Sequence, residues 1–199
     1  PPPPPPFSSR RRHTRSLVPS RGLGDVYKRQ GIQVYRGRVR PEWIDVNEHM
    51  NVAYYVLAFD LGVDALWTRF GITDDSIADT RGSTFAVEAH LTYQAELHLD
   101  DEFVVTTEIL AYDRKRIHQF QRMYRHKDAT LVATAEWMNL FVDLAVRKVA
   151  EWPADVLSSI AAIAGAQSAS ALPAEVGRRM RVKSPLFALH PPNDEGANP

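Results

Sequence analysis

One stretch with helical periodicity, followed by four stretches with period two, is the feature that most limits how this chain can fold. Between Asn51 and Phe70 the apolar residues recur at steps of mostly three and four, in the order Val52, Val56, Phe59, Val63, Leu66, Trp67 and Phe70. This spacing predicts an amphipathic helix of about five turns. Gly71 follows directly, at the position where glycine commonly ends a helix.

Alternation of apolar and polar residues dominates the chain after this helix. The segment FAVEAHLTY puts Glu88 and His90 on one face of a strand and the apolar residues on the other, namely Phe85, Val87, Ala89, Leu91 and Tyr93. Three more such segments follow, EFVVTTEIL, RIHQFQRMY and TLVATAEWMNLFVD, with short polar turns between them. We therefore expect four successive strands that are joined by hairpins and hence antiparallel.

The remaining elements complete an α+β arrangement. A strand is predicted at residues 33–40, with the sequence QVYRGRVR, and a second helix at residues 154–163, directly after Pro153. A long helix with apolar residues on much of its circumference needs cover on more than one side, which a strongly curved sheet supplies. The predicted fold class is therefore α+β, with one domain over residues 31–165 and a loosely ordered tail over residues 166–199.

The first 30 residues differ from the rest of the chain in composition. They contain seven Lys or Arg residues and one Asp, although the 199 residues together carry no net charge. A Pro-rich and Arg-rich segment of this kind is typical of a disordered arm that binds nucleic acid. Its short segments SRRRHTR and GDVYKRQ also resemble translated sequencing-adapter read-through. We interpret residues 1–30 as a disordered, non-native tail and expect no nucleic-acid partner.

Composition excludes several classes of site. The chain has no cysteine, which rules out thiol catalysis, disulfides and cysteine-based zinc sites. The apolar runs are too short to span a bilayer, and the N-terminus lacks the apolar middle of a secretory signal. We expect a cytoplasmic protein with no membrane partner.

The stretch DVNEHMN, residues 45–51, places an acid, an amide and an imidazole at alternate positions just before the long helix. In an extended segment, Asp45, Asn47 and His49 share one side of the chain. A carboxylate such as that of Asp45 can activate water or attack a carbonyl, and free backbone N–H groups at residues 50–53 can stabilise an oxyanion. The same residue types are also ordinary turn and N-cap residues, so catalysis and helix capping both account for the motif.

The histidines do not form a metal-binding pattern. No H-E-x-x-H or similar spacing occurs among His49, His90, His98, His118 and His126. We therefore predict no metal site, and the chemistry proposed for Asp45 requires no cofactor.

The order strand, D-x-N-x-H-x-N, long helix and four strands resembles the hotdog-fold thioesterases over residues 32–160. The run PEWIDVNEHMNVAYYVLAFD, with VEAHLTY and RIHQFQRMY, is similar to the betainyl-CoA thioesterases of carnitine breakdown, which usually carry glycine where this chain has Glu48. The resemblance implies a curved sheet wrapped around a central helix, and hydrolysis of betainyl-CoA or another short acyl-CoA. It also implies assembly into a homodimer or a dimer of dimers.

Roles for individual residues follow from the same resemblance. Asp45 falls where the 4-hydroxybenzoyl-CoA thioesterase group keeps its catalytic aspartate, and Glu88 resembles the strand acid that faces this motif in plant acyl-carrier-protein thioesterases. These two residues, with Asn47 and His49, are the predicted catalytic set. The predicted substrate contacts are Trp43, Asn51, Val52, Tyr54, Tyr55, Phe59 and Phe85.

Some alternatives stay open on the sequence alone. The basic cluster at residues 114–116 either binds the phosphates of CoA or is a solvated hairpin tip. A hydratase or dehydratase on the same fold would also pair an acid with a histidine. A non-catalytic module that binds acyl-CoA or nucleic acid is the third reading.

Overall fold

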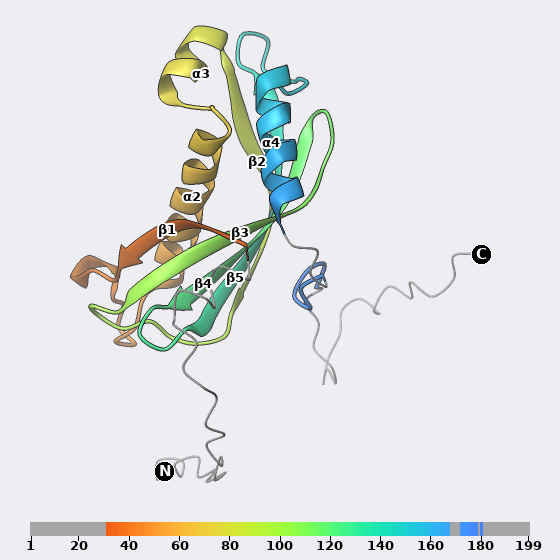
Figure 1. Cartoon of the computed structure of the whole chain (residues 1–199). Helices are drawn as coiled ribbons and strands as arrows, with labels where there is room; N and C mark the ends of the chain where they lie inside the picture. Colours follow the sequence, from red (N-terminus) through yellow and green to blue (C-terminus); the bar gives the residue numbers. More distant parts are fainter. Residues whose placement is uncertain (1–30, 168–171, 179, 181–199) are drawn as a thin grey trace, which may run out of the picture.

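The computed structural model describes residues 31–167, 172–178 and 180 (Figure 1). The predicted tail at residues 1–30 and most of the predicted tail at residues 166–199 lie outside the described residues. The described elements, in chain order, are β1 (Ile32–Arg38), η1 (Pro41–Trp43), α2 (Val52–Arg69), α3 (Asp74–Thr80), β2 (Gly82–Tyr93), β3 (Glu102–Tyr112), β4 (Arg116–Arg125), β5 (Thr130–Asp143), β6 (Lys148–Val149) and α4 (Ala154–Ala166).

The five long strands form one antiparallel sheet in the order β1-β3-β4-β5-β2, and the short β6 pairs with the end of β5. The prediction of four strands in successive hairpins is therefore wrong at its first step, because β2 pairs with β5 and not with β3. Residues 94–101 instead cross from β2, at one edge of the sheet, to β3, which lies next to the opposite edge strand β1. Leu97 of this crossing segment is completely buried in the core, and its burial stabilises the crossing. The alternating pattern of the strands could not predict this path.

A bulge in β2 changes the predicted faces of that strand. The pairing register between β2 and β5 shifts between Ala86 and Glu88. As a result, Ala89 pairs with Trp137 on the inner face, whereas Phe85 pairs with Leu140 on the outer face. The prediction that Phe85 shares a face with Leu91 and Tyr93 is wrong for this reason. An inserted residue reverses the alternation on one side of a bulge.

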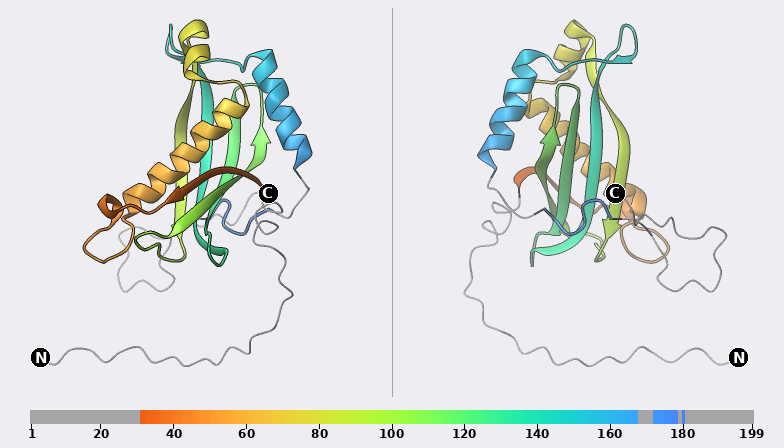
Figure 2. Two further views of the ribbon diagram at one scale, coloured as in Figure 1. Left: turned by 60° about the vertical axis from the view of Figure 1, so that its left-hand side comes forward. Right: turned by 90° about the vertical axis from the view of Figure 1, so that its right-hand side faces the viewer.

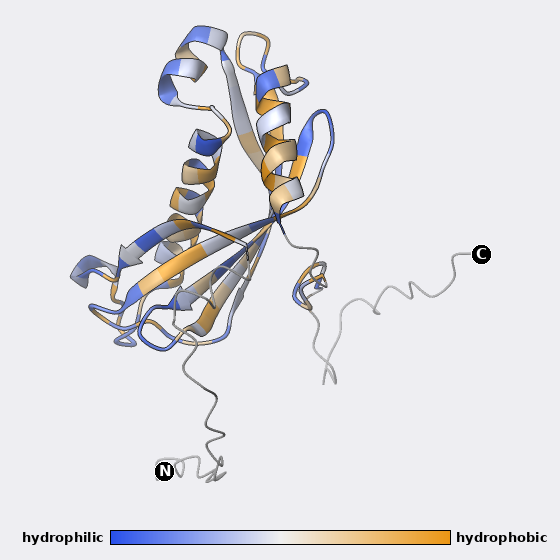
Figure 3. Ribbon diagram, viewed as in Figure 1, coloured by the Kyte–Doolittle hydropathy of each residue, from blue (hydrophilic) through white to orange (hydrophobic). Residues whose placement is uncertain are grey.

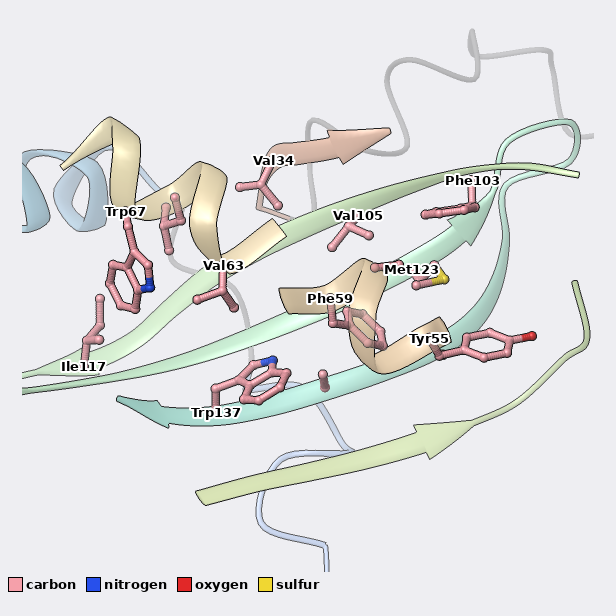
Figure 4. Close-up of a cluster of buried hydrophobic side chains, with 14 of the residues drawn as sticks. Val34, Tyr55, Phe59, Val63, Trp67, Phe103, Val105, Ile117, Met123 and Trp137 are labelled. Atoms are coloured by element: carbon pink, nitrogen blue, oxygen red, sulfur yellow. The ribbon is translucent and has the colours of Figure 1, made fainter. Parts of the chain in front are cut away.

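Helix α2 lies across the inner face of the curved sheet (Figure 2). Phe59, Val63 and Trp67 of the helix pack in one apolar cluster with Val105 and Met123 of the sheet (Figure 4). Along the helix, apolar and polar bands alternate as the three-and-four spacing requires (Figure 3). This arrangement is the predicted α+β fold.

A close approach between α2 and the sheet occurs at Gly62. A Cβ at this position would lie 2.9 Å from Gln121 Nε2 and 3.1 Å from a methyl group of Val34. Gln121 is itself fixed, because it donates to Thr107 Oγ1 at 3.2 Å and accepts from Trp137 Nε1 at 2.9 Å. The helix therefore needs glycine here to sit above a buried polar network.

The ends of the helices follow local capping rules. Asn51 caps α2 by accepting from Ala53 N–H, and Gly71 follows the C-cap residue with a φ of 89°. The sequence analysis missed α3, which begins with a reciprocal capping box between Thr73 and Ser76. None of the described helices combines the length and the apolar composition that a membrane span requires.

Candidate active site

Residues 45–50 form a tight loop between η1 and α2. Ile44 and Met50 form an isolated antiparallel bridge, and within it Asp45 N–H donates to the His49 carbonyl at 3.1 Å. Glu48 N–H donates to the Asp45 carbonyl at 3.0 Å, and Glu48 takes a left-handed backbone conformation with a φ of 64°. The loop is thus a closed turn, and Glu48 is in the backbone conformation that glycine favours.

Two backbone hydrogen bonds hold this loop against the rest of the fold. Met50 N–H donates to the Leu97 carbonyl at 2.8 Å, and Asn51 N–H donates to the Trp43 carbonyl at 2.9 Å. Leu97 belongs to the segment that crosses the sheet, and its own N–H donates to the hydroxyl of Tyr55 at 3.0 Å. The position of the loop therefore depends on the crossing segment as well as on α2.

The carboxylate of Asp45 is held at the base of the loop, with 20% of the side chain accessible. One oxygen, Oδ1, accepts from Asn47 N–H at 2.8 Å. The other, Oδ2, lies 3.5 Å from Asn51 Nδ2, which is the long limit of a hydrogen bond. Oδ2 therefore has lone pairs left for a water molecule or a substrate atom.

His49 lies next to this carboxylate, and the Asn47 side chain does not. His49 Nδ1 is 3.9 Å from Asp45 Oδ1 and 3.3 Å from the Met50 carbonyl oxygen, so it is near the acid without a direct hydrogen bond to it. Asn47 is exposed and reaches Asp45 through its backbone N–H. The predicted acid and imidazole are thus brought together, and the amide contributes through the main chain.

The start of α2 offers one free amide where the sequence suggested four. Met50 and Asn51 donate to backbone carbonyls, and Ala53 donates to the Asn51 side chain at 3.0 Å. Among the described residues, the N–H of Val52 has no acceptor within hydrogen-bond distance. Val52 N–H, at the positive end of an 18-residue helix, is the donor that remains for an oxyanion.

A cavity of about 280 Å³ opens beside the loop. The residues that line it are His49, Met50, Val52, Tyr55, Tyr93, Gln94, Ala95 and Glu96. The sequence analysis singled out the first turn of the helix and missed the wall formed by residues 93–96. No local signal marked that wall, because residues 94–96 belong to the link that was taken for a hairpin.

Residues 39–160 of the chain match the thioesterase-like superfamily. The chain belongs to this superfamily. The predicted class of enzyme, a thioesterase, is therefore confirmed. Over 149 residues the chain is 33% identical to the betainyl-CoA thioesterase of Pseudomonas aeruginosa. The match covers 75% of this chain and 94% of that protein.

Solved structures of relatives support the same family and the fold. A hypothetical protein from Staphylococcus aureus in complex with CoA is 29% identical, with a TM-score of 0.73 over 76% of this chain and 96% of that chain. A 1,4-dihydroxy-2-naphthoyl-CoA thioesterase from Synechocystis has 17% identity and a TM-score of 0.58, over 64% of this chain and 93% of that chain. The predicted hotdog fold is thereby confirmed.

Within this thioesterase-like fold, Glu88 lies apart from the Asp45 loop. It pairs with Met138 on the outer face of the sheet, one residue from Trp137, which faces the core. There it lines a separate cavity of about 350 Å³ with His118 and Glu136, which are hydrogen-bonded to each other at 2.8 Å. One copy of the chain does not bring Glu88 to the predicted catalytic residues.

The predicted aromatic contacts divide into three groups. Tyr55 lines the cavity, and Trp43 stacks on Tyr54 behind the loop with ring centroids 5.2 Å apart. Phe59 has no exposed surface and supports the core. Phe85 lies on the outer face, 39% exposed, with the guanidinium of Arg147 at 5.8 Å from its ring.

The basic hairpin that follows β3 lines a larger cavity at the far end of the sheet from the Asp45 loop (Figure 1). This cavity measures about 490 Å³ and is lined by Asp113, Arg114, Lys115, Arg116, Leu140, Val149 and Glu151. In the part of the chain that the structure describes, no group of three or more His, Asp or Glu side chains is arranged to hold a metal ion.

Proposed function

We propose that the protein hydrolyses a short acyl-CoA thioester, with a betainyl group as the preferred acyl chain and Asp45 as general base or nucleophile. The observation that carries this proposal is a partly buried carboxylate, with lone pairs left on one oxygen, in the loop that leads into an unpaired amide at the first turn of α2. His49 and Met50 of the loop line a cavity together with Val52 of that turn. The 33% identity to a betainyl-CoA thioesterase supports the acyl group.

The reaction needs two functions from the chain, and these residues supply both. Asp45 takes a proton from water as its oxygen attacks the thioester carbonyl, or it attacks the carbonyl itself. The negative charge that develops on the carbonyl oxygen is stabilised by Val52 N–H. When the tetrahedral intermediate collapses, the C–S bond breaks, and the CoA thiolate leaves and takes up a proton. Where Asp45 is the nucleophile, water then hydrolyses the acyl–Asp45 anhydride, which releases the acid and restores the carboxylate.

Release of free thiol from betainyl-CoA tests the role of Asp45. A positioned general base contributes about 10²- to 10⁴-fold to a rate, so Asp45→Asn is expected to lower kcat by a factor in that range. Glu42→Gln is a matched control, because Glu42 is an exposed carboxylate just before the loop. Equal rates for wild type and Asp45→Asn would overturn the assignment of Asp45.

We further propose that two copies pair through β2 to complete the binding site. β2 forms an edge of the sheet, and Val87 is 56% exposed there. On the neighbouring helix, Val56 and Leu57 are also exposed. Unpaired edge strands with apolar side chains readily pair with a second strand.

Antiparallel pairing would also give the basic hairpin at residues 114–116 a role in binding CoA. In a two-fold pair, the Gly82 end of one β2 lies beside the Tyr93 end of the other. The Gly82 end is next to the hairpin, since Phe141 N–H donates to the Lys115 carbonyl at 3.0 Å and Phe141 pairs with Thr84. One copy would thus bring the charges of residues 114–116 towards the Asp45 loop of the other, where they can bind CoA phosphates.

A further inference from the structure

The cavity beside the Asp45 loop has the size of an acyl group. An apolar cavity of about 150 Å³ holds benzene, which has six heavy atoms. The volume here is about 280 Å³, with His49 and Val52 contributed by the loop and the start of α2, and Tyr93 and Glu96 by the end of β2 and the link after it. The space therefore suits a short acyl chain and is too small for the nucleotide of CoA.

Two tyrosines form the aromatic part of this wall. Tyr55 and Tyr93 meet edge to face, with ring centroids 5.4 Å apart and an interplanar angle of 80°. Tyr55 is 4% exposed and its hydroxyl is fixed by Leu97 N–H, whereas Tyr93 is 48% exposed. Tyr55 extends from the edge of the core cluster (Figure 4), so it supports Tyr93 and leaves the accessible ring to Tyr93.

The charge around the cavity favours a cation. Among the described residues that line it, the only carboxylate is that of Glu96, and none is Lys or Arg. Glu96 is an exposed side chain, and His98 Nε2 lies 3.8 Å from its carboxylate. Burial raises the pKa of Tyr55, and the Glu96 carboxylate adds to this effect, so its charge is felt at the aromatic wall.

We propose that this wall binds the cationic end of the acyl group, with the quaternary ammonium against the ring of Tyr93 and the carboxylate of Glu96 facing it. Aromatic rings attract quaternary ammonium groups through the negative charge of their faces. This inference rests on the proposed function and adds the residues that select the acyl chain. Tyr93 and Glu96 are binding residues in this assignment, and Asp45 performs the chemistry.

A pair of substrates of equal shape separates charge from size. Betainyl-CoA and 3,3-dimethylbutyryl-CoA differ at one atom, a positively charged nitrogen or a neutral carbon that carries three methyl groups. We expect the wild type to have the higher kcat/KM for betainyl-CoA. Tyr93→Leu should lower the betainyl-to-neutral ratio of kcat/KM by about 2- to 30-fold, whereas Tyr93→Phe, which keeps the ring, should retain the ratio.

The carboxylate is tested with the same two substrates. Glu96→Gln should lower the ratio by about 2- to 5-fold at low salt, and by less at high salt, because the group is exposed. Asp60→Asn makes the same change in net charge on the exposed face of α2 and should leave the ratio unchanged.

Several results would overturn this assignment. An equal loss on both substrates after Tyr93→Leu would mean that the cavity holds a part common to both thioesters. A fall in the ratio with Asp60→Asn as large as with Glu96→Gln would mean that the charge effect is not local. A wild type that hydrolyses other acyl-CoA esters without preference for the cation would refute the inference and leave the thioesterase in place, whereas failure on every acyl-CoA would refute the proposed function as well.

Discussion

Glu48 carries the backbone of the Asp45 loop through a left-handed turn. Its φ of 64° is unfavourable for a residue with a Cβ, and the two hydrogen bonds across the loop hold it there. The Glu48 carbonyl also lies 3.3 Å from His98 Nδ1, which ties the turn to the crossing segment. The conformation of the Asp45 loop is thus maintained at some cost in stability.

Replacing Glu48 with glycine should release this strain. Glu48→Gly is expected to raise the free energy of unfolding by about 1 kcal/mol, measured by urea denaturation. Glu48→Ala keeps a Cβ in the same conformation and should stay within about 0.5 kcal/mol of the wild type. A glycine variant that is less stable than the alanine variant would show that the turn carries no such strain.

At the scale of single residues, the sequence predicted the site residues that are close together in the chain and missed those that only the fold brings together. Asp45 and His49 are four residues apart on one turn, so a short motif was enough to place them together. Tyr93 and Glu96 reach the cavity because the end of β2 and the link after it contact the first turns of α2, which no motif records. Phe85 lies on the outer face because of a bulge, and alternation alone cannot locate an inserted residue.

At the scale of elements, the contact between α2 and the sheet should not tolerate a side chain at Gly62. Alanine favours helices over glycine, but here its Cβ would press on Gln121 and Val34. Gly62→Ala is therefore expected to lower the free energy of unfolding by about 1 to 3 kcal/mol. Gly165→Ala in α4 is the matched control, because nothing lies within 4 Å of a Cβ there, and it should raise stability by up to about 1 kcal/mol. Equal effects at the two sites would contradict the role given to Gly62.

Two carboxylates in the turns at the ends of β4 make the stability of the protein fall as the pH becomes acidic. Hydrogen bonds from Lys115 N–H and Arg116 lower the pKa of Asp113 to about 2, and those from the Arg125 side chain and Thr130 N–H lower the pKa of Asp128 to about 2. Both carboxyls ordinarily titrate near 3.8. Their contribution is therefore complete above that value and is lost as the pH falls towards about 2.

The measurement is Tm across this range of pH. The wild type should lose Tm between about pH 4 and about pH 2, and a double variant with Asn at positions 113 and 128 should lose less, because it has no carboxyls to protonate there. Asp79→Asn, on the exposed surface of α3, serves as the control and should follow the wild type. Parallel curves for wild type and double variant would refute the assignment.

Each long helix or strand could be predicted from its own stretch of sequence, but the pairing of the strands could not. The helical stripe and the alternating segments gave α2 and the four long strands to within a few residues, since each pattern reports which face is buried. Strand partners depend on where the chain goes between strands. The link at residues 94–101 contains two leucines, of which Leu97 has no exposed surface and Leu99 is 48% exposed, and two leucines in a polar link do not distinguish a crossing from a turn.

At the scale of the whole molecule, the exposed edge of β2 predicts the state of association. Val87→Lys places a charge on that edge and should shift the protein from dimer to monomer in sedimentation velocity, because charged residues on an edge strand oppose pairing. Thiol release should fall with the dimer if the basic hairpin acts across the pair. Val146→Lys, at an exposed turn after β5, is the control and should leave association unchanged. A wild type that is monomeric and fully active would contradict the proposed pairing.

The path of residues 94–101 has a consequence for how this protein can diverge. The same few residues line the cavity proposed for the acyl chain and, through the Leu97 carbonyl, fix the N–H of Met50. We therefore expect a mutation in that link to alter selectivity and turnover at once. Tyr93 precedes the link and has no hydrogen bond to the loop among the described residues, so we expect it to be the position from which descendants can acquire new substrates without losing the reaction.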